Sequence, residues 1–286
     1  MEKDPLDIYL DFPLEELTFI KKFYMTNLAP QWRVFGNTEN LQRSYDVSVV
    51  IPSIGRRELL KALASVFEQN IDRIQILIGI DKPDNDLSFL DLFLVNCPKN
   101  VTVNIIYPGY STSVRHGGIT QARDGGALRS FLTQLANSKY VAYLDDDNWW
   151  DKTHLEDLLE AIKNKAWAFS LRYFVYPPPE TRMVLDQWES VGPGKGVFLK
   201  NFGGFADPNT LMINKELCWE CVSLWNFPLK NDPLGMSADR NIFNFLKDHS
   251  EPGMTNKGTV FYKISPNDSN HENRMYALGN IPKKNT

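Results

Sequence analysis

The chain has 286 residues, 43% of them hydrophobic and 23% charged, proportions that exclude a disordered or fibrous protein. At this length it buries enough surface to fold as one large α/β domain or as two closely packed subdomains. Thirty-one basic residues against 35 acidic ones give a net charge of −4, which provides no long-range attraction for nucleic acid. A small anionic ligand is still compatible with this charge, because a local group of cations is enough to bind it.

The cysteine content predicts the compartment. Cys97, Cys218 and Cys221 are too few for a disulfide framework, and no apolar leader opens the chain. We therefore expect a cytoplasmic protein. No apolar run approaches the roughly 20 residues that cross a bilayer, so no transmembrane segment is expected. Peripheral contact with the inner face of the membrane stays open.

Residues 1–45 are predicted to form an N-terminal helical extension that packs on the main domain. Apolar residues recur in it at broadly helical spacing, between charged positions: Ile8, Leu10, Leu14, Leu17, Ile20 and Phe23. The alternative to packing on the domain is a surface that binds a partner or a membrane.

From residue 46 onward the pattern alternates between strands and helices. In chain order we expect a strand, a helix, two strands, a helix and a strand: DVSVVIP, residues 58–69, RIQILIGID, VTVNIIYP, residues 120–137 and YVAYLDDD. Three of the strands are continuously apolar, as strands covered on both faces must be: VSVVI, IQILIGI and YVAYL. This alternation predicts an α/β fold with a mainly parallel central sheet flanked by helices. Residues 148–286 are less regular, and we expect a smaller α+β part there.

Three polar segments follow predicted strands directly, at the carboxyl ends where open α/β sheets bind ligands. They are residues 52–57, 81–84 and 145–147. A ligand site at this edge of the sheet is therefore expected.

The most informative of these segments is the triplet Asp145, Asp146 and Asp147. Side chains alternate along a strand, so Asp145 and Asp147 can converge while Asp146 points elsewhere. Two converging carboxylates repel unless a cation joins them, and Mg²⁺ or Mn²⁺ accepts carboxylate and phosphate oxygens together. The alternative is that the triplet caps the following helix, but Asp151 is already available as that cap. The triplet therefore predicts a divalent-metal site that neutralises charge on a diphosphate leaving group.

The segment YVAYLDDDN resembles the Asp-x-Asp segment of GT-A glycosyltransferases, and the surrounding order resembles glycosyltransferase family 2. VVIPSIGRRELLKALASVFEQ is similar to the family's opening strand and helix, and ILIGIDKPDND to its second strand. ITQARDGGALRSFLTQLANSKYVAYLDDD is similar to its Ala-Arg-Asn-x-Gly helix and metal strand. The resemblance implies the GT-A fold, with a nucleotide-sugar-binding part at residues 46–147. Residues 148–286 would then form the acceptor-binding part and a C-terminal loop.

The resemblance implies a set of donor-binding residues: Pro52, Ser53, Arg56, Asp81, Arg123, Asp145 and Asp146. Asp81 would accept a hydrogen bond from uracil or another base, and Arg123 would approach the base or the diphosphate. Each has a structural alternative: a strand end for Pro52 and Ser53, a turn cap for Asp81 and a solvated helix arginine for Arg123. The choice between Arg56 and its neighbour Arg57 stays open.

Two further residues are implied in the second half. PLGMSADRNIFNFLKDH resembles the family's acceptor-side Glu-Asp segment and places Asp239 as general base, although Ala238 stands where the family more often has Glu. The alternative is a first-turn aspartate capped by Ser237. TVFYKISPNDSNHENR resembles the last strand and closing loop, which makes His271 the candidate third metal ligand beside Asp145 and Asp147. A solvated histidine is its alternative.

The leading hypothesis is a metal-dependent glycosyltransferase with Mn²⁺ or Mg²⁺ as cofactor. It would transfer a sugar from a nucleotide diphosphate donor, preferably a UDP-sugar, to a saccharide or other hydroxyl acceptor. Inversion of configuration follows from the resemblance alone. One alternative is a sugar-phosphate nucleotidyltransferase, disfavoured because IPSIGRRE holds a single glycine where a glycine-rich phosphate loop is needed. The other is a nucleotide-sugar or carbohydrate-binding scaffold without turnover, for which Ala238 leaves room.

Overall fold

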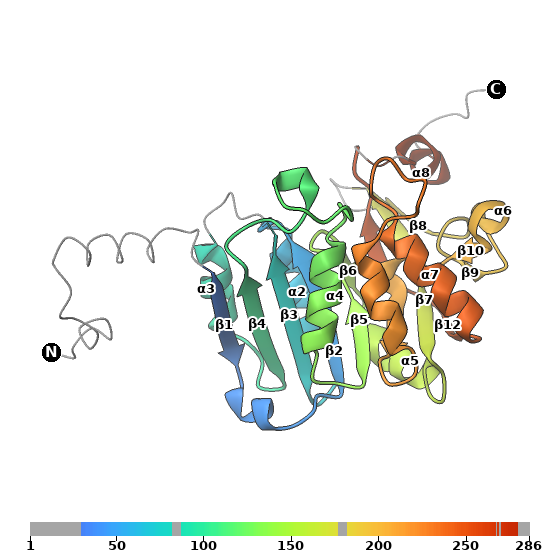
Figure 1. The fold of residues 1–286 in the computed structure, drawn as a ribbon. Coiled ribbons are helices and arrows are strands. Elements are labelled where there is room, and N and C mark those ends of the chain that lie inside the picture. Colours follow the sequence, from blue (N-terminus) through green and yellow to red (C-terminus); the bar gives the residue numbers. More distant parts are fainter. Residues whose placement is uncertain (1–29, 82–86, 177–181, 267, 269, 280–286) are drawn as a thin grey trace, which may run out of the picture.

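The computed structural model describes residues 30–81, 87–176, 182–266, 268 and 270–279 (Figure 1). Within these ranges a ten-stranded mixed sheet runs through the molecule in the order β1-β4-β3-β2-β5-β11-β7-β12-β6, with β8 paired to β7. A small second sheet pairs β9 (Gly192–Pro193) with β10 (Gly204–Phe205). The described helices are neither long nor apolar enough for any of them to span a membrane.

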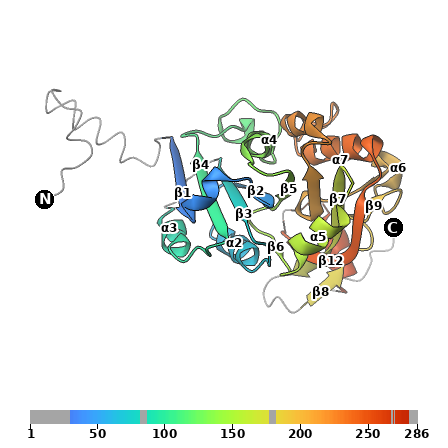
Figure 2. The ribbon, with the colours of Figure 1, turned by 90° about the horizontal axis from the view of Figure 1, so that it is seen from below.

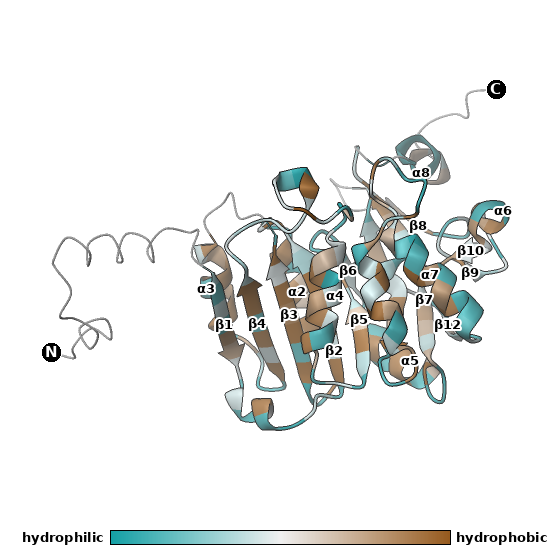
Figure 3. Ribbon diagram, viewed as in Figure 1, coloured by the Kyte–Doolittle hydropathy of each residue, from teal (hydrophilic) through white to brown (hydrophobic). Residues whose placement is uncertain are grey.

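Four parallel strands form the first half of the sheet. They are β2 (Val47–Ser53), β3 (Ile74–Ile80), β4 (Val101–Tyr107) and β5 (Tyr140–Tyr143). Nearly every residue in them is buried, because helices cover both faces, and Figure 3 shows the corresponding brown strands. The predicted parallel core is therefore confirmed.

Figure 2 shows helices on both sides of the sheet. One face packs on apolar residues of α2 (Leu59–Phe67), α3 (Ser88–Leu94) and α5 (His154–Ala161). The other face packs on α4 (Gly126–Leu135), the 3₁₀ segment η5 (Trp219–Asn226) and α7 (Ala238–His249). These two apolar cores cover both faces of the sheet. The carboxyl ends of the strands are left uncovered, and polar groups lie there.

The helix expected over residues 120–137 begins later than predicted. Gly125 has φ +80°, a left-handed conformation that favours glycine, so α4 starts only at Gly126. A Cβ added to Gly126 would lie 1.9 Å from the carbonyl oxygen of Trp225, which explains why glycine opens this helix. Residues 120–125 consequently form a loop at the edge of the sheet.

The second half of the chain continues the same sheet instead of forming a separate unit. β11 (Leu211–Asn214) pairs antiparallel with both β5 and β7 (Trp167–Tyr176). Beyond β7, β12 (Gly253–Lys263) runs parallel to it and pairs with β6 (Trp149–Trp150). The remaining elements are β8 (Arg182–Leu185), α6 (Leu199–Phe202), η3 (Val114–His116), η4 (Pro208–Thr210) and α8 (His271–Ala277).

The N-terminal extension differs from its prediction where the structure describes it. Residues 31–36 form a strand, β1 (Gln31–Gly36), which pairs antiparallel with β4, and η2 (Thr38–Gln42) follows. The edge of β4 has unpaired backbone N–H and C=O groups, and β1 pairs its own backbone groups with them. The hydrogen bonds gained by this pairing favour a strand over a helix here. The apolar positions from Ile8 to Phe23 lie outside the described residues.

Candidate functional site

A cavity of about 420 Å³ lies at the carboxyl ends of β2, β3 and β5. Nine of the ten predicted site residues line it, and His271 does not: Pro52, Ser53, Arg56, Asp81, Arg123, Asp145, Asp146, Asp147 and Asp239. Arg57, the alternative to Arg56, is exposed outside the cavity and lies over the Phe89 ring. The fold therefore gathers in one place residues that lie up to 187 positions apart in the sequence.

One end of the cavity is built around Asp81, which is buried just beyond β3. One of its carboxylate oxygens accepts hydrogen bonds from the backbone N–H and the hydroxyl of Thr112, both at 2.7 Å, and the other accepts one from Ser111 at 3.1 Å. These bonds fasten the loop after β4 over the cavity, where Arg115 and His116 join the lining. Asp81 therefore does more than cap a turn, because it holds the loop after β4 in place.

The acidic triplet does not arrange itself as strand alternation predicts. β5 ends at Tyr143, so the three acids lie in a turn, and all three side chains line the cavity. Arg56 joins two of them, with Nη1 donating to Asp147 at 3.0 Å and Nη2 donating to Asp146. Asp146 is buried and also accepts a 2.6 Å bond from Ser53. The prediction that Asp146 points away from its neighbours was wrong.

Asp145 is held on the opposite side by different partners. Arg129 of α4 is buried and donates both to a carboxylate oxygen of Asp145 and to the backbone oxygen of Asp124. Asn209 contacts the other carboxylate oxygen at 2.8 Å. The triplet is therefore neutralised in part by two arginines, Arg56 and Arg129.

Asp239 lies in the first turn of α7 and faces the cavity. Its Oδ1 is shielded from solvent and has no hydrogen-bond partner, and the same holds for Oδ1 of Asp124 nearby. Ser237 does not cap the helix through its side chain, because its hydroxyl donates to Asp232 instead. An unpartnered buried carboxylate oxygen is costly, and a hydroxyl-bearing ligand would satisfy it.

Burial raises the pKa of two acids that line this cavity, Asp239 and Asp147. It raises the pKa of Asp239 to about 7, with the carboxylates of Asp124 and Asp207 acting in the same direction and Arg240 in the opposite one. Burial also raises the pKa of Asp147 to about 6, against the effect of the Arg56 guanidinium. An acid with a pKa near neutrality is well matched to accepting a proton at physiological pH.

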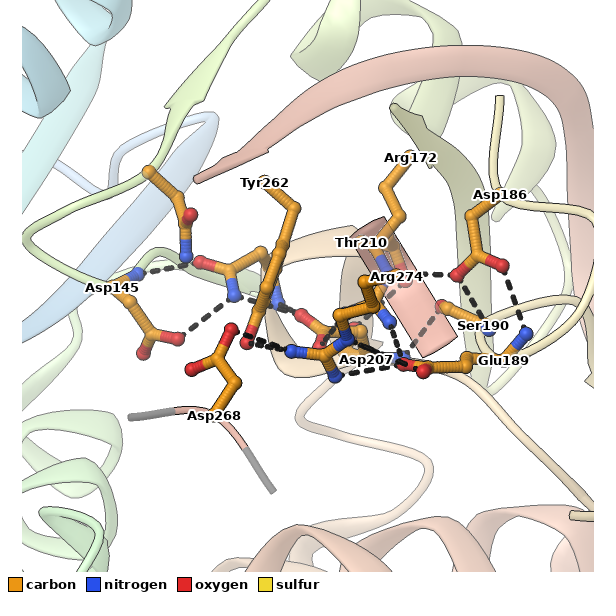
Figure 4. Close-up of polar contacts among 12 residues, drawn as sticks. Asp145, Arg172, Asp186, Glu189, Ser190, Asp207, Thr210, Tyr262, Asp268 and Arg274 are labelled. Atoms are coloured by element: carbon orange, nitrogen blue, oxygen red, sulfur yellow. Dashed lines mark hydrogen bonds and ion pairs between the residues drawn. The ribbon is translucent and has the colours of Figure 1, made fainter. Parts of the chain in front are cut away.

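A buried polar network extends from the cavity into the second half of the chain (Figure 4). Arg172 is 1% exposed and donates to the carboxylates of Asp186, Glu189 and Asp207. Arg274 of α8 donates to Glu189 as well and to Asp268, which lines the cavity. Arg274 is consequently engaged within the protein by two carboxylates.

The chain is similar to known proteins both in part of its sequence and in its fold. Residues 112–222 match the family model described as glycosyl transferase family 2. The fold is similar to S. aureus TarS 1–349 in complex with UDP-GlcNAc, with a TM-score of 0.56 and 13% identity over 82% of this chain and 65% of that one. Residues 112–222 are thus similar to glycosyltransferase family 2, and the described part of the chain has the GT-A fold. The predicted fold class and family resemblance are thereby confirmed.

A second GT-A neighbour is the mannosyltransferase PcManGT from Pyrobaculum calidifontis in complex with GDP-Man and Mn²⁺. Its TM-score is 0.52 at 12% identity, over 89% of this chain and 65% of that one. At such identities the likeness establishes the fold, and this GT-A chain spans less than two thirds of the length of either neighbour. No curated protein sequence matches it significantly.

Two of the three predicted metal ligands, Asp145 and Asp147, line the cavity. Across the described ranges, no group of three or more His, Cys, Asp or Glu side chains is placed to hold a metal ion. His271 begins α8 and its Nδ1 lies 2.9 Å from the backbone oxygen of Ser265, so the structure does not bring it to the acids. Asp145 and Asp147 nevertheless fit a divalent ion, since Mg²⁺ commonly binds through one or two carboxylates together with substrate phosphates.

Sequence reasoning missed Arg129 and Asn209, the two side chains that hold Asp145. Arg129 did leave a signal, since it stands between the buried Leu128 and Leu132 on the apolar stripe of α4, where a charge needs a buried partner. Asn209 left none, because its segment carries no periodic pattern and its partner is 64 positions away.

Proposed function

We propose that this protein is a glycosyltransferase that moves a sugar from a UDP-sugar to a hydroxyl group of a saccharide or similar acceptor, with inversion. The observation that carries the proposal is one cavity lined at one end by Asp81 and along its wall by the acidic triplet and Asp239. Such a cavity has a carboxylate for a base edge, carboxylates for a metal–diphosphate group and a separate acid for the acceptor. The TarS complex with UDP-GlcNAc and the PcManGT complex with GDP-Man and Mn²⁺ support this choice of donor class.

Each residue has a chemical task in this proposal. Asp81 accepts a hydrogen bond from the base, and Ser53 and Arg123 bind the nucleoside or diphosphate. Mn²⁺ or Mg²⁺, held by Asp145 and Asp147, would neutralise charge on the leaving diphosphate. Arg56 reaches the same side of the cavity and is already turned toward Asp146 and Asp147.

Asp239 acts as general base in this proposal. Its unpartnered Oδ1 takes the proton of the acceptor hydroxyl while that oxygen attacks the anomeric carbon from the side opposite the diphosphate. A pKa of about 7 leaves a substantial share of the carboxylate ionised at neutral pH. Asp239 therefore performs this step without the Glu that the family more often has beside it.

The decisive experiment is calorimetric titration with UDP-glucose, UDP-galactose, UDP-N-acetylglucosamine and GDP-mannose, each with and without Mn²⁺. We expect one donor to bind with a Mn²⁺-dependent affinity, and Asp147→Ala to remove the contribution of Mn²⁺ while leaving the fold intact. Absence of binding for every donor would refute the proposal. Binding without hydrolysis or transfer to any acceptor would favour a nucleotide-sugar-binding scaffold instead.

The location of the protein is also proposed. All three cysteines are free thiols, and Cys218 and Cys221 are buried. Free, buried thiols are typical of a reducing compartment, which supports the cytoplasm as the site of action. Labelling of thiols in intact cells, followed by mass spectrometry, tests this, and a disulfide recovered from any of the three would contradict it.

A further inference from the structure

We propose that Asn209 is a positioning residue that fixes the orientation of Asp145 for the donor site. The inference rests on the proposed function. Asn209 belongs to η4, is fully buried and does not line the cavity. Nothing in its own segment marks it as functional.

Asn209 forms two hydrogen bonds with Asp145. Its side-chain oxygen accepts a 2.6 Å hydrogen bond from the backbone N–H of Asp145, and its side-chain nitrogen donates a 2.8 Å bond to Oδ2 of Asp145. One bond fixes the main chain just beyond β5 and the other fixes the carboxylate. Because Arg129 holds the remaining oxygen, Asp145 keeps a single orientation at the cavity wall.

The amide of Asn209 is itself oriented by Asp207. Oδ1 of Asp207 accepts bonds from the backbone N–H of Asn209 at 2.9 Å and from its Nδ2 at 2.7 Å. A carboxylate only accepts hydrogen bonds, so the side-chain contact with Asp207 and the contact with Oδ2 of Asp145 both require the amide nitrogen where it stands. Trp150 donates a 2.9 Å bond to the backbone oxygen of Asn209 and completes its polar contacts.

Asp207 cannot readily turn, because its other oxygen is bound to the buried guanidinium of Arg172. Arg172 is bound in turn to Asp186 at 2.9 Å and to Glu189 at 2.8 Å (Figure 4). All three guanidinium nitrogens are therefore engaged in the interior. The chain Arg172, Asp207, Asn209 and Asp145 transmits this fixed geometry to the edge of the donor cavity.

A role in positioning differs measurably from a role in stability alone. Partners that orient a metal ligand contribute about 10- to 100-fold to metal affinity or activity when they are removed. We expect Asn209→Ala to weaken Mn²⁺-dependent binding of UDP by this factor in calorimetry. Binding of UDP without Mn²⁺ should change little, since Asp81 and Ser53 are untouched.

Two further variants sharpen the test. Asn209→Asp keeps the shape of the side chain but removes the hydrogen-bond donor to Asp145. If Asn209 positions Asp145, this variant should lose at least as much Mn²⁺-dependent affinity for UDP as Asn209→Ala. If Asn209 only fills space, the variant should bind UDP nearly as wild type does. Asn214→Ala is the matched control, because Asn214 is also buried and accepts a bond from Glu216 of its own segment, far from the acids. It should lose stability without losing Mn²⁺-dependent affinity. Each variant is measured below its own unfolding temperature.

The outcomes separate this inference from the proposed function. If Asn209→Ala binds UDP with Mn²⁺ as wild type does, or if Asn214→Ala loses the same affinity, Asn209 has no positioning role. Should Asn209→Asp not fold, the comparison of Asn209→Ala with Asn214→Ala decides alone. A wild-type protein that binds neither UDP nor Mn²⁺ would overturn the proposed function and this inference together.

Discussion

The two halves of the sheet handle charge in opposite ways. In residues 46–147 the acids that follow the strand ends line a cavity, and Arg56 and Arg129 pair with them there. In the second half a fully buried arginine, Arg172, sits within β7 and gathers three carboxylates from separate segments. In the first arrangement the charged groups face a cavity that a ligand can enter. In the second, Arg172 and its three carboxylates pair with one another inside the protein. The comparison teaches that a buried ionic cluster can balance its charges within the protein, even when it adjoins a cavity.

The largest expected effect falls on catalysis. Asp239→Asn removes the proposed base while preserving shape, and loss of a general base lowers the rate by about 10²- to 10⁴-fold. Donor binding should persist, because Asp81 and the acidic triplet are unchanged. Steady-state kinetics with the donor identified by calorimetry measures both quantities. A variant with an unaltered kcat would remove Asp239 from the reaction.

Arg172→Leu should have the next largest effect, on stability. It leaves three carboxylates without their shared cation, and breaking a buried ion pair costs about 3 to 5 kcal/mol. Arg73→Leu serves as the control in the first half, since Arg73 and its partner Asp46 are 35% and 33% exposed. We expect urea unfolding to show a large loss for the first variant and a small one for the second. Equal losses would end the distinction between the two halves.

Arg56→Leu should instead weaken binding of the donor together with Mn²⁺. In the proposed function its guanidinium lies at the cavity wall beside the diphosphate, and a hydrogen bond to a charged group contributes about 1.5 to 3 kcal/mol. This corresponds to about 10- to 100-fold in affinity. The substitution Arg57→Leu is the matched control, because Arg57 lies outside the cavity. Calorimetry that finds the two variants alike would exclude Arg56 from the site.

The smallest effect is a shift in pH dependence. With a pKa of about 7 for Asp239, kcat/KM should rise as pH increases through 7, because only the ionised carboxylate accepts a proton. Asp124→Asn removes a negative charge that raises this pKa, so the rise should move to lower pH. The other groups that face Asp239 are Arg240, Asp207 and Arg129, and they are unchanged in this variant. A pH profile that does not move would show that Asp124 has no influence on the base.

Much of the structure of residues 46–147 was predictable. Continuous apolar runs marked β2, β3 and β5, and the polar residues that follow these strands marked the cavity. Both signals are local, since they depend on residues adjacent in sequence. The prediction for the extension was less successful at β1, because a strand at a sheet edge depends on the neighbour it pairs with.

The sequence by itself determined the strands of the parallel part of the sheet and the placement of Asp81, Asp145 and Asp147 just beyond strand ends, because burial on both faces imposes an apolar pattern that can be read residue by residue. Only the tertiary structure decided which groups hold those acids. Arg129 and Asn209 meet Asp145 across 16 and 64 positions, and Arg172 meets Asp207 across 35. Such contacts arise from the packing of separate elements, and a buried polar side chain acquires its partner only when that packing is complete.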